Sequence, residues 1–310
     1  MYIGIDLGGT NIAAGIVDEN GQILCKGSLP TLRERGNDAI VADMAKLSKM
    51  LVEENGYSMN DIKAVGIGCP GTVDNERGIV VYSNNIVMEN YPLVAKFKEY
   101  IDLPVNIEND ANAAAYGEYA STARDKKSFV LITLGTGVGG GIVLDGKLWR
   151  GFNGAGAELG HTSIIMGGEP CTCGRRGCFE AYASVSALIS QTKRAMEENP
   201  DSLMHKIAEE RGVVNGRTSF DCARMGDEVA IAVRDKYIEY VSEGVVNIIN
   251  TIQPEVFVIG GGISREGDTI LTPLKKIVEK NDYNKYMPKT EIRIAKLGND
   301  AGIIGAAALA

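Results

Sequence analysis

Asp110 closes the segment Glu108-Asn109-Asp110, which ends an apolar, strand-like run and precedes the alanine-rich stretch ANAAAYGEY. Ligands of α/β sheets bind at the carboxyl ends of strands, so a side chain in this place belongs to a site. A carboxylate there can take the proton of a hydroxyl that attacks phosphorus. We therefore predict that Asp110 is a catalytic base. An aspartate directly ahead of a helix can also be an N-cap and nothing more, and this remains the alternative.

A glycine-rich turn follows the first strand-like run and has the composition of a phosphate-binding loop. It reads Asp6-Leu7-Gly8-Gly9-Thr10-Asn11. Glycines permit the close backbone approach and the unusual dihedral angles that a bound phosphate requires. We predict that Asp6 faces a Mg²⁺ ion and that the loop residues bind phosphate, namely Gly8, Gly9, Thr10 and Asn11. The alternative is a tight hairpin turn with an exposed acid.

The sequence repeats this loop at about half its length. LGGTNIAAGIVDENGQIL, from Leu7, resembles LGTGVGGGIVLDGKLW, from Leu134. Each copy predicts a strand, a glycine turn, a second strand, a polar turn and a third strand. Two copies of one unit indicate duplication and a protein with two lobes. The repeat predicts a second phosphate loop at Gly135, Thr136 and Gly137.

Gly135, Gly137 and Gly140 also match G-x-G-x-x-G, which makes an NAD-dependent oxidoreductase the rival interpretation. That fingerprint requires a following helix, whereas GGGIVLDGKLW is rich in strand formers and turns, and no acidic residue ends a second strand some 20 positions on. A third glycine cluster, Gly260, Gly261 and Gly262, follows the strand-like VFVI. Its flat backbone could pass an adenine ring, or it could be a turn without a ligand.

A cluster of cysteines and one histidine has the composition of a metal site. His161, Cys171, Cys173 and Cys178 read H-x9-C-x-C-x4-C. Four such ligands predict a closed, tetrahedral, structural Zn²⁺ site, with free thiols or a disulfide as the alternatives. One nitrogen of His161 would bind zinc and leave the other for a substrate hydroxyl.

Polar side chains near these motifs could bind a sugar, because carboxylates and amides hold rows of hydroxyls through short hydrogen bonds. The candidates are Asn109, Glu158, His161 and Glu180, with the zinc loop presenting the two glutamates. Of the remaining candidates for chemistry, Cys25, Cys69 and Cys222 are expected to be core thiols and His205 a surface residue.

Composition excludes several classes of protein. The chain has 310 residues, 45% hydrophobic and 23% charged, with a net charge of −8, which gives no basic face for nucleic acid or an anionic membrane. No run of 18 apolar residues predicts a spanning helix. The sequence enters a strand at once, without a signal-peptide pattern, so we expect a cytoplasmic protein whose thiols are reduced.

The hydrophobic pattern predicts alternating strands and helices, hence an α/β protein with mixed or parallel sheets. The expected elements are helices near 38–54 and 227–252, a terminal helix in AGIIGAAALA, and strands at 64–69, 105–108, 128–134, 256–260 and 291–295. We place a hinge between the lobes near residues 118–127.

Together these residues resemble the ROK family (repressors, open reading frames and kinases) over essentially the whole chain. The similarity rests on DLGGTN at Asp6–Asn11, CPG at Cys69–Gly71, END at Glu108–Asp110, LGTGVGGGIV from Leu134, GAGAELGH at Gly154–His161 and CTCGRRGCFE at Cys171–Glu180. The resemblance implies an α/β fold of two ribonuclease-H-like (actin-like ATPase) lobes, with ATP and a sugar in an inter-lobe cleft. The lobes would comprise residues 1–119 with 298–310, and residues 120–297. It also implies a homodimer or homotetramer.

Carried over by position, the resemblance makes Asp110 the base and Asn109, Glu158, His161 and Glu180 sugar ligands, with Gly71 and Asn85 as further sugar contacts. The cysteine pattern and Glu-Leu-Gly-His are most similar to members that phosphorylate the 6-hydroxyl of glucose. Kinases of N-acetylmannosamine, N-acetylglucosamine, fructose or allose share nearly all the motifs and remain alternatives. Family repressors carry an N-terminal DNA-binding extension, which we do not expect here because the first strand starts at once. A non-catalytic sugar sensor also remains open, although Asp110 is present.

Overall fold

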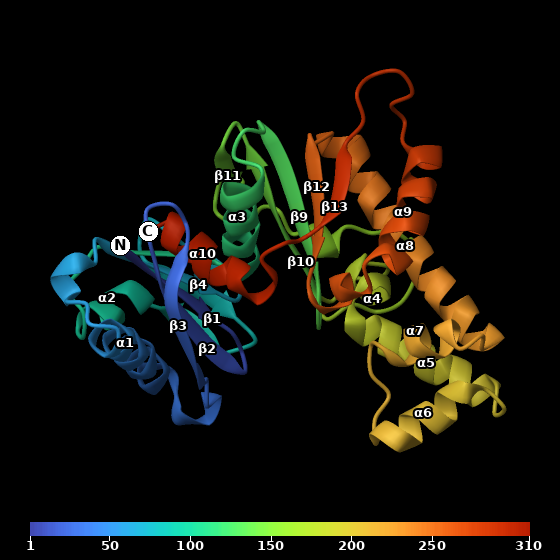
Figure 1. Cartoon of the computed structure of the whole chain (residues 1–310), viewed down its shortest axis with the longest axis horizontal. Coiled ribbons are helices and arrows are strands. Elements are labelled where there is room, and N and C mark those ends of the chain that lie inside the picture. The colour runs from blue at the N-terminus through green and yellow to red at the C-terminus, as the bar shows by residue number, and fades with distance from the viewer. The chain divides into compact units, whose positions relative to one another are not determined.

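The computed structural model describes all 310 residues, which form two compact units of mixed α/β structure (Figure 1). The first unit comprises Met1–Leu131, Gly141–Ala157 and Lys296–Ala310, and the second comprises Ile132–Gly140 and Glu158–Ala295. The α/β class predicted from the sequence is confirmed. The lobe boundaries and the hinge inferred from the sequence stay predictions. No helix has both the length and the apolar composition that a membrane span needs.

A five-stranded sheet forms the centre of the first unit. Its strands, in the spatial order β3-β2-β1-β4-β8, are β3 (Ile23–Pro30), β2 (Asn11–Val17), β1 (Tyr2–Leu7), β4 (Ala64–Cys69) and β8 (Val105–Asn109). β1, β4 and β8 run parallel, whereas β2 and β3 are antiparallel to their neighbours. The carboxyl ends of the three parallel strands therefore meet at one edge, where ligands of such sheets bind.

Helices cover both faces of this sheet because side chains alternate along each strand. Ile3 and Ile5 lie in the core with Met44 of α1 (Asn37–Glu54) and Phe97 of α2 (Leu93–Lys98). Gly4 faces the other side, where α10 (Ala301–Ala308) packs on β1 and β4 and beside α3 (Asp110–Thr122) (Figure 1).

Glycines set the depth of the α10 contact. A Cβ built at Gly66 of β4 would lie 1.8 Å from the carbonyl oxygen of Ala306, so only glycine allows this approach. The returning chain is also fixed by a buried acid, since Glu118 accepts the backbone N–H groups of Lys296 at 2.8 Å and Leu297 at 3.0 Å. The terminal helix thus lies directly behind the strands whose ends carry the predicted site.

A small sheet that the sequence did not predict lies in the first unit. It consists of β5 (Thr72–Asp74), β6 (Ile79–Ser83) and β7 (Met88–Tyr91), all antiparallel. β5 starts directly after the Pro70-Gly71 turn that follows β4, so this sheet fixes the path of the chain next to the carboxyl edge.

A second five-stranded sheet repeats the first design. Its order is β11-β10-β9-β12-β13, with β9 (Ser128–Leu134), β10 (Val138–Leu144), β11 (Lys147–Trp149), β12 (Val256–Gly260) and β13 (Glu291–Ile294). Strand, glycine turn, strand, polar turn and strand occur in both β1–β3 and β9–β11. The internal repeat predicted from the sequence is therefore confirmed at the level of secondary structure.

The second unit holds most of the helices. They are α4 (Glu180–Ala183), α5 (Val185–Glu198), α6 (Leu203–Arg211), α7 (Thr218–Arg224), α8 (Glu228–Ile252) and α9 (Asp268–Asn281). Residues of α5 to α8, among them Met196, Met204 and Cys222, share a small core. The strands expected at 64–69, 128–134 and 256–260 have the predicted bounds, and the other expected elements differ by one or two residues.

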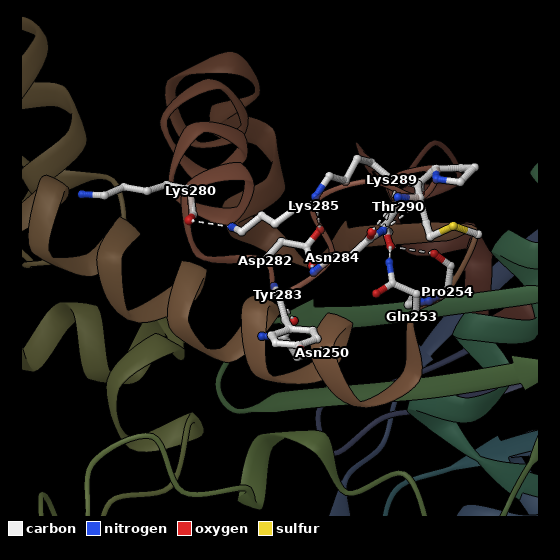
Figure 2. Close-up of polar contacts among 12 residues, drawn as sticks. Asn250, Gln253, Pro254, Lys280, Asp282, Tyr283, Asn284, Lys285, Lys289 and Thr290 are labelled. Atoms are coloured by element: carbon white, nitrogen blue, oxygen red, sulfur yellow. Dashed lines mark hydrogen bonds and ion pairs between the residues drawn. The ribbon is translucent and has the colours of Figure 1, made fainter.

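The loop between α9 and β13 is tied down by polar contacts (Figure 2). Asp282 is 3% exposed, and its carboxylate accepts Lys289 Nζ at 2.8 Å and the N–H of Asn284 at 2.9 Å. Thr290 donates to the carbonyl of Pro254 at 2.7 Å. This ordered loop contains no residue of the predicted site.

Candidate active site

Asp110 is the first residue of α3, and the cap of that helix is its neighbour. Asn109 has extended backbone, and its side-chain oxygen accepts the N–H of Asn112 at 3.1 Å. The alternative explanation of Asp110 as an N-cap is therefore wrong, because Asn109 fills that role. The Asp110 carboxylate accepts the N–H of Ala111 at 2.8 Å. Its side chain remains available for chemistry at the carboxyl edge of β8.

Two carboxylates at this edge have perturbed acidity. Burial raises the pKa of Asp110 above its ordinary range. Asp6, at the end of β1, has its pKa raised from 3.8 to about 6, first by burial and second by the negative charge of Asp110. Asp6 also packs against α10, since a Cβ built at Gly302 would lie 2.6 Å from its Oδ2. Burial makes ionisation of both acids costly, and the charge of Asp110 adds to that cost for Asp6. A bound cation would lower this cost, so the pair is suited to a metal ion.

Three residues predicted to contact a sugar lie around the same edge. Asn109 Nδ2 donates to the carbonyl of Gly71 at 3.0 Å, which joins the ends of β4 and β8. Gly71 has a φ of +102°, and a Cβ there would lie 2.1 Å from the Tyr82 carbonyl oxygen, so the turn requires glycine. Asn85 lies against the first glycine loop, because a Cβ built at Gly9 would be 3.5 Å from its carbonyl oxygen. The structure brings these residues together.

The first glycine loop is held through its carbonyl groups. Gly8 N–H donates to Asn11 O at 2.9 Å, Thr31 Oγ1 donates to Gly8 O at 2.7 Å, and Thr31 N–H donates to Thr10 O at 2.8 Å. No hydrogen bond found in the structure uses the N–H groups of Gly9 and Thr10. A loop with fixed carbonyls and available N–H groups is suited to an anion.

The second glycine loop is held in the same way. Gly135 N–H donates to Gly137 O at 3.0 Å, Val185 N–H donates to Gly135 O at 2.8 Å, and Ser186 Oγ donates to Thr136 O at 2.8 Å. The segment after the loop is strand β10, so the helix required by a dinucleotide fingerprint is absent. The oxidoreductase interpretation of Gly135, Gly137 and Gly140 is therefore wrong.

The third glycine cluster lies beside the second loop. Gly261 has a φ of +84°, and a Cβ there would lie 2.3 Å from the carbonyl oxygen of Leu134. Gly260 ends β12, and Gly262 begins a short 3₁₀ helix. Unusual dihedral angles were predicted for the first loop, but Gly8 and Gly9 have no positive φ. Gly8 instead avoids the Asn11 carbonyl oxygen, which a Cβ would approach to 3.0 Å.

The four predicted metal ligands converge in the second unit. The ligand atoms of His161, Cys171, Cys173 and Cys178 all lie within 4.8 Å of one another. Cys171 Sγ is 3.7 Å from His161 Nδ1, and Cys173 Sγ is 3.7 Å from Cys178 Sγ. A tetrahedral ion with Zn–S bonds of about 2.3 Å separates its sulfur ligands by about 3.8 Å. The donor set and its spacing therefore fit zinc, and the geometry assigns Nδ1 of His161 to the metal side.

Glu180 links the cysteine loop to the second glycine loop. Its Oε2 accepts the N–H of Val138 at 2.9 Å, and its Oε1 lies 3.8 Å from Cys171 Sγ. A Cβ at Gly137 would be 2.3 Å from the same Oε2, so the Glu180 carboxylate would have to move. Glu158 is exposed one turn before His161, whose N–H donates to the Glu158 carbonyl at 3.1 Å. The predicted groups of the second unit thus lie on one connected set of loops.

Several residues that shape these loops had no signal in the sequence. Thr31 and Ser186 fix the two glycine loops from other segments. Their hydroxyls belong to no motif, and only the folded chain brings them to the loops. The remaining cysteines behave as expected, with Cys69 and Cys222 buried and Cys25 half-buried, and His205 is exposed.

The chain belongs to the ROK family, whose profile matches residues 2–310. It is 37% identical to the glucokinase of Halalkalibacterium halodurans over 306 residues, 98% of this chain and 93% of that protein. It is 38% identical to the glucokinase of Thermotoga maritima over 309 residues, 99% of this chain and 96% of that protein. A solved ROK glucokinase from Streptomyces griseus, in complex with glucose and AMPPNP, is 36% identical with a TM-score of 0.85, covering 100% of this chain and 98% of that one.

Proposed function

We propose that this chain is an ATP-dependent hexokinase that phosphorylates the 6-hydroxyl of glucose, with Asp110 as the catalytic base. The observation that carries the proposal is the position of the Asp110 carboxylate. Asp110 directly follows β8 at the carboxyl edge, does not cap α3, and lies near Asp6 at the start of the first glycine loop. The similarity to glucokinases over nearly the full chain supports glucose as the acceptor.

The raised pKa of Asp110 suits a base. A carboxylate with a higher pKa binds a proton more strongly, which favours its acceptance of the proton from the attacking hydroxyl. Phosphoryl transfer itself needs little covalent help, so positioning of the sugar hydroxyl carries much of the catalysis. We assign sugar binding to six residues besides the base: Gly71, Asn85 and Asn109 of the first unit, and Glu158, His161 and Glu180 of the second.

The nucleotide phosphates are assigned to the glycine loops. Available N–H groups in both loops support this, and the cluster Gly260–Gly262 beside the second loop suits the adenosine end. Asp6, with its neighbouring acid, would hold Mg²⁺, which supplies charge neutralisation at the phosphates when bound. His161 and the three cysteines would hold a structural Zn²⁺ that fixes the loop from Glu158 to Glu180.

The experiment that tests this function is a coupled assay with saturating MgATP over a panel of sugars. Glucose should give the highest kcat/KM, with product carrying phosphate on the 6-hydroxyl. A higher kcat/KM for N-acetylmannosamine, N-acetylglucosamine, fructose or allose would support the kinase activity but show that glucose is not the preferred sugar. Absence of product with every sugar, in protein that still binds glucose, would favour a non-catalytic sensor. The cytoplasmic localisation of the protein and its assembly as a homodimer or homotetramer remain predictions.

A further inference from the structure

Glu108, two residues before the proposed base, is a buried acid for which the chemistry proposed above has no use. Its exposed fraction is 3%. A carboxylate that deep is costly unless donors surround it, so its partners indicate why the fold keeps it.

Four donors from four different residues converge on this one carboxylate. Oε1 accepts the N–H of Asn109 at 3.0 Å and Nδ2 of Asn112 at 3.1 Å. Oε2 accepts Nε of Arg150 at 2.6 Å and Nδ2 of Asn75 at 3.2 Å. An ionised carboxylate is the only side chain of this size that accepts everywhere and donates nowhere. A glutamine would turn an NH₂ group toward at least one of these donors.

The donors come from the segments that form the proposed acceptor site. Asn75 follows β5 and also donates to the carbonyl of Ile107. Asn112 is in the first turn of α3, and Asn109 holds the Gly71 carbonyl. Glu108 thereby ties the start of α3, which carries Asp110, to the small sheet and the Gly71 turn.

Arg150 connects a further segment to this centre. It follows β11, and its carbonyl accepts the N–H of Gly156 at 2.8 Å, which closes the loop from residue 150 to 156. Its side chain is 36% exposed, whereas that of Glu108 is 3% exposed, so the guanidinium reaches the acid from the surface. The loop that it holds leads along the chain to Ala157, which has a φ of +64°, and then to Glu158.

We propose that Glu108 is a positioning residue for Asn109 and Asp110 and that Arg150 is its partner, the two fixing the acceptor side of the proposed kinase site. The inference rests on the proposed function. Neither residue needs to touch the sugar. Their effect passes through the backbone of Asn109 and through the loop that Arg150 closes.

A second pair in the same chain provides a matched control (Figure 2). Asp282 and Lys289 are 2.8 Å apart with side-chain exposures of 4% and 41%, against 2.6 Å, 3% and 36% for Glu108 and Arg150. Both pairs join a buried carboxylate to a surface cation and fix a loop. Only the pair of Glu108 lies beside proposed site residues, so stability effects should be shared and kinetic effects should not.

The test compares Glu108→Gln, Arg150→Ala and Arg150→Lys with Asp282→Asn and Lys289→Ala. For Glu108→Gln we expect kcat to fall about 10-fold or more and KM for glucose to rise about 5-fold, with KM for ATP within about 2-fold, on the scale of small misplacements. Arg150→Ala should show a smaller change of the same kind, which Arg150→Lys partly restores. Both control variants should lower Tm and leave all kinetic constants within about 2-fold.

The outcomes separate the two proposals. An inactive wild-type protein would refute the kinase function. If the wild type is active and folded Glu108→Gln has unchanged kcat and KM values, only the positioning role is refuted. Equal rises in KM for glucose and ATP would also overturn it, because a general loosening of the fold would then explain the data. If Glu108→Gln does not fold, the two Arg150 variants test the positioning role instead. Kinetic constants of Arg150→Ala equal to those of Lys289→Ala would then refute the inference.

Discussion

The two glycine loops have the same backbone plan and different acids. In each, a hydroxyl and a backbone N–H from a distant segment hold the loop carbonyls, through Thr31 in the first loop and through Ser186 and Val185 in the second. The first loop follows Asp6, whose pKa is raised to about 6 beside Asp110. The corresponding position in the second repeat is Thr133, and its loop is instead contacted by Glu180 from α4.

This difference suggests how a duplicated unit divides its work. Both loops are suited to bind an anion, because in each the carbonyl groups accept hydrogen bonds from a hydroxyl and a backbone N–H of another segment. Only the first copy combines the cradle with two interacting carboxylates, and only the second is joined to a metal-ligand cluster. We therefore assign proton transfer to the first unit and a purely binding role to the second.

The largest expected effect is on the free energy of unfolding. It comes from replacing Asp6, the acid that has no counterpart in the second loop, with a neutral residue. Because folding raises the pKa of Asp6 from 3.8 to about 6, the folded state binds this proton more tightly than the unfolded state. Its stabilising contribution is present below pH 3.8 and is lost as the pH rises to about 6. At about pH 7.5, Asp6→Asn should raise the free energy of unfolding by up to about 3 kcal/mol, at 1.36 kcal/mol per pKa unit, while activity falls.

Urea unfolding at about pH 7.5 and about pH 5 measures this effect. The gain should shrink at the lower pH, where Asp6 is already partly protonated. Destabilisation by Asp6→Asn at the higher pH would show that the carboxylate is favourably paired and would remove the contrast between the loops.

The next largest effect concerns Gly137, where Glu180 fills the space that a side chain would need. Gly137→Ala should lower kcat/KM about 100-fold, because the methyl group must displace the carboxylate, and misplacement of a site group by about 1 Å costs that much. Gly27→Ala is the control, since Gly27 lies outside the proposed site and a Cβ there would meet only side-chain atoms of Leu47 and Leu51, at 3.3 Å. Similar kinetic losses in the two variants would contradict the proposed role of Glu180.

Removal of a metal ligand should have a moderate effect that only the second unit shows. Cys173→Ser should release zinc, measured by elemental analysis, and raise KM for glucose about 10-fold, the lower end for loss of a supporting ligand shell. Cys25→Ser changes a half-buried cysteine outside the cluster, and this variant should keep the zinc content and the KM for glucose of the wild type. Wild-type protein purified without chelators and lacking zinc would end the metal assignment.

The smallest effects test the likeness of the loops. Thr31→Ala and Ser186→Ala each remove one hydroxyl donor to a loop carbonyl, worth about 1 kcal/mol or about 5-fold in kcat/KM for ATP. Equal losses would support a shared design. A loss confined to one variant would show that only one loop holds phosphate.

The features that could be predicted from the sequence are those that depend on residues close together in the chain. Both strand-turn-strand repeats follow from alternating apolar residues and glycines, and the cysteine spacing led to four side chains that converge in space. The cap of α3 was misplaced by one residue, because Asn109 and Asp110 are both good caps and only backbone geometry distinguishes them. The contacts of Glu108 with Asn75 and Arg150 could not be predicted, since they join segments about 30 to 40 residues away that no pattern relates.

The most direct test of the central claim is the turnover of Asp110→Asn with glucose and MgATP, together with calorimetric binding of glucose. Asparagine keeps the shape and a hydrogen-bond acceptor but cannot take the proton. We predict that kcat falls about 100-fold or more while the Kd for glucose stays within about 3-fold. Turnover close to that of the wild type would contradict it and would place the base elsewhere.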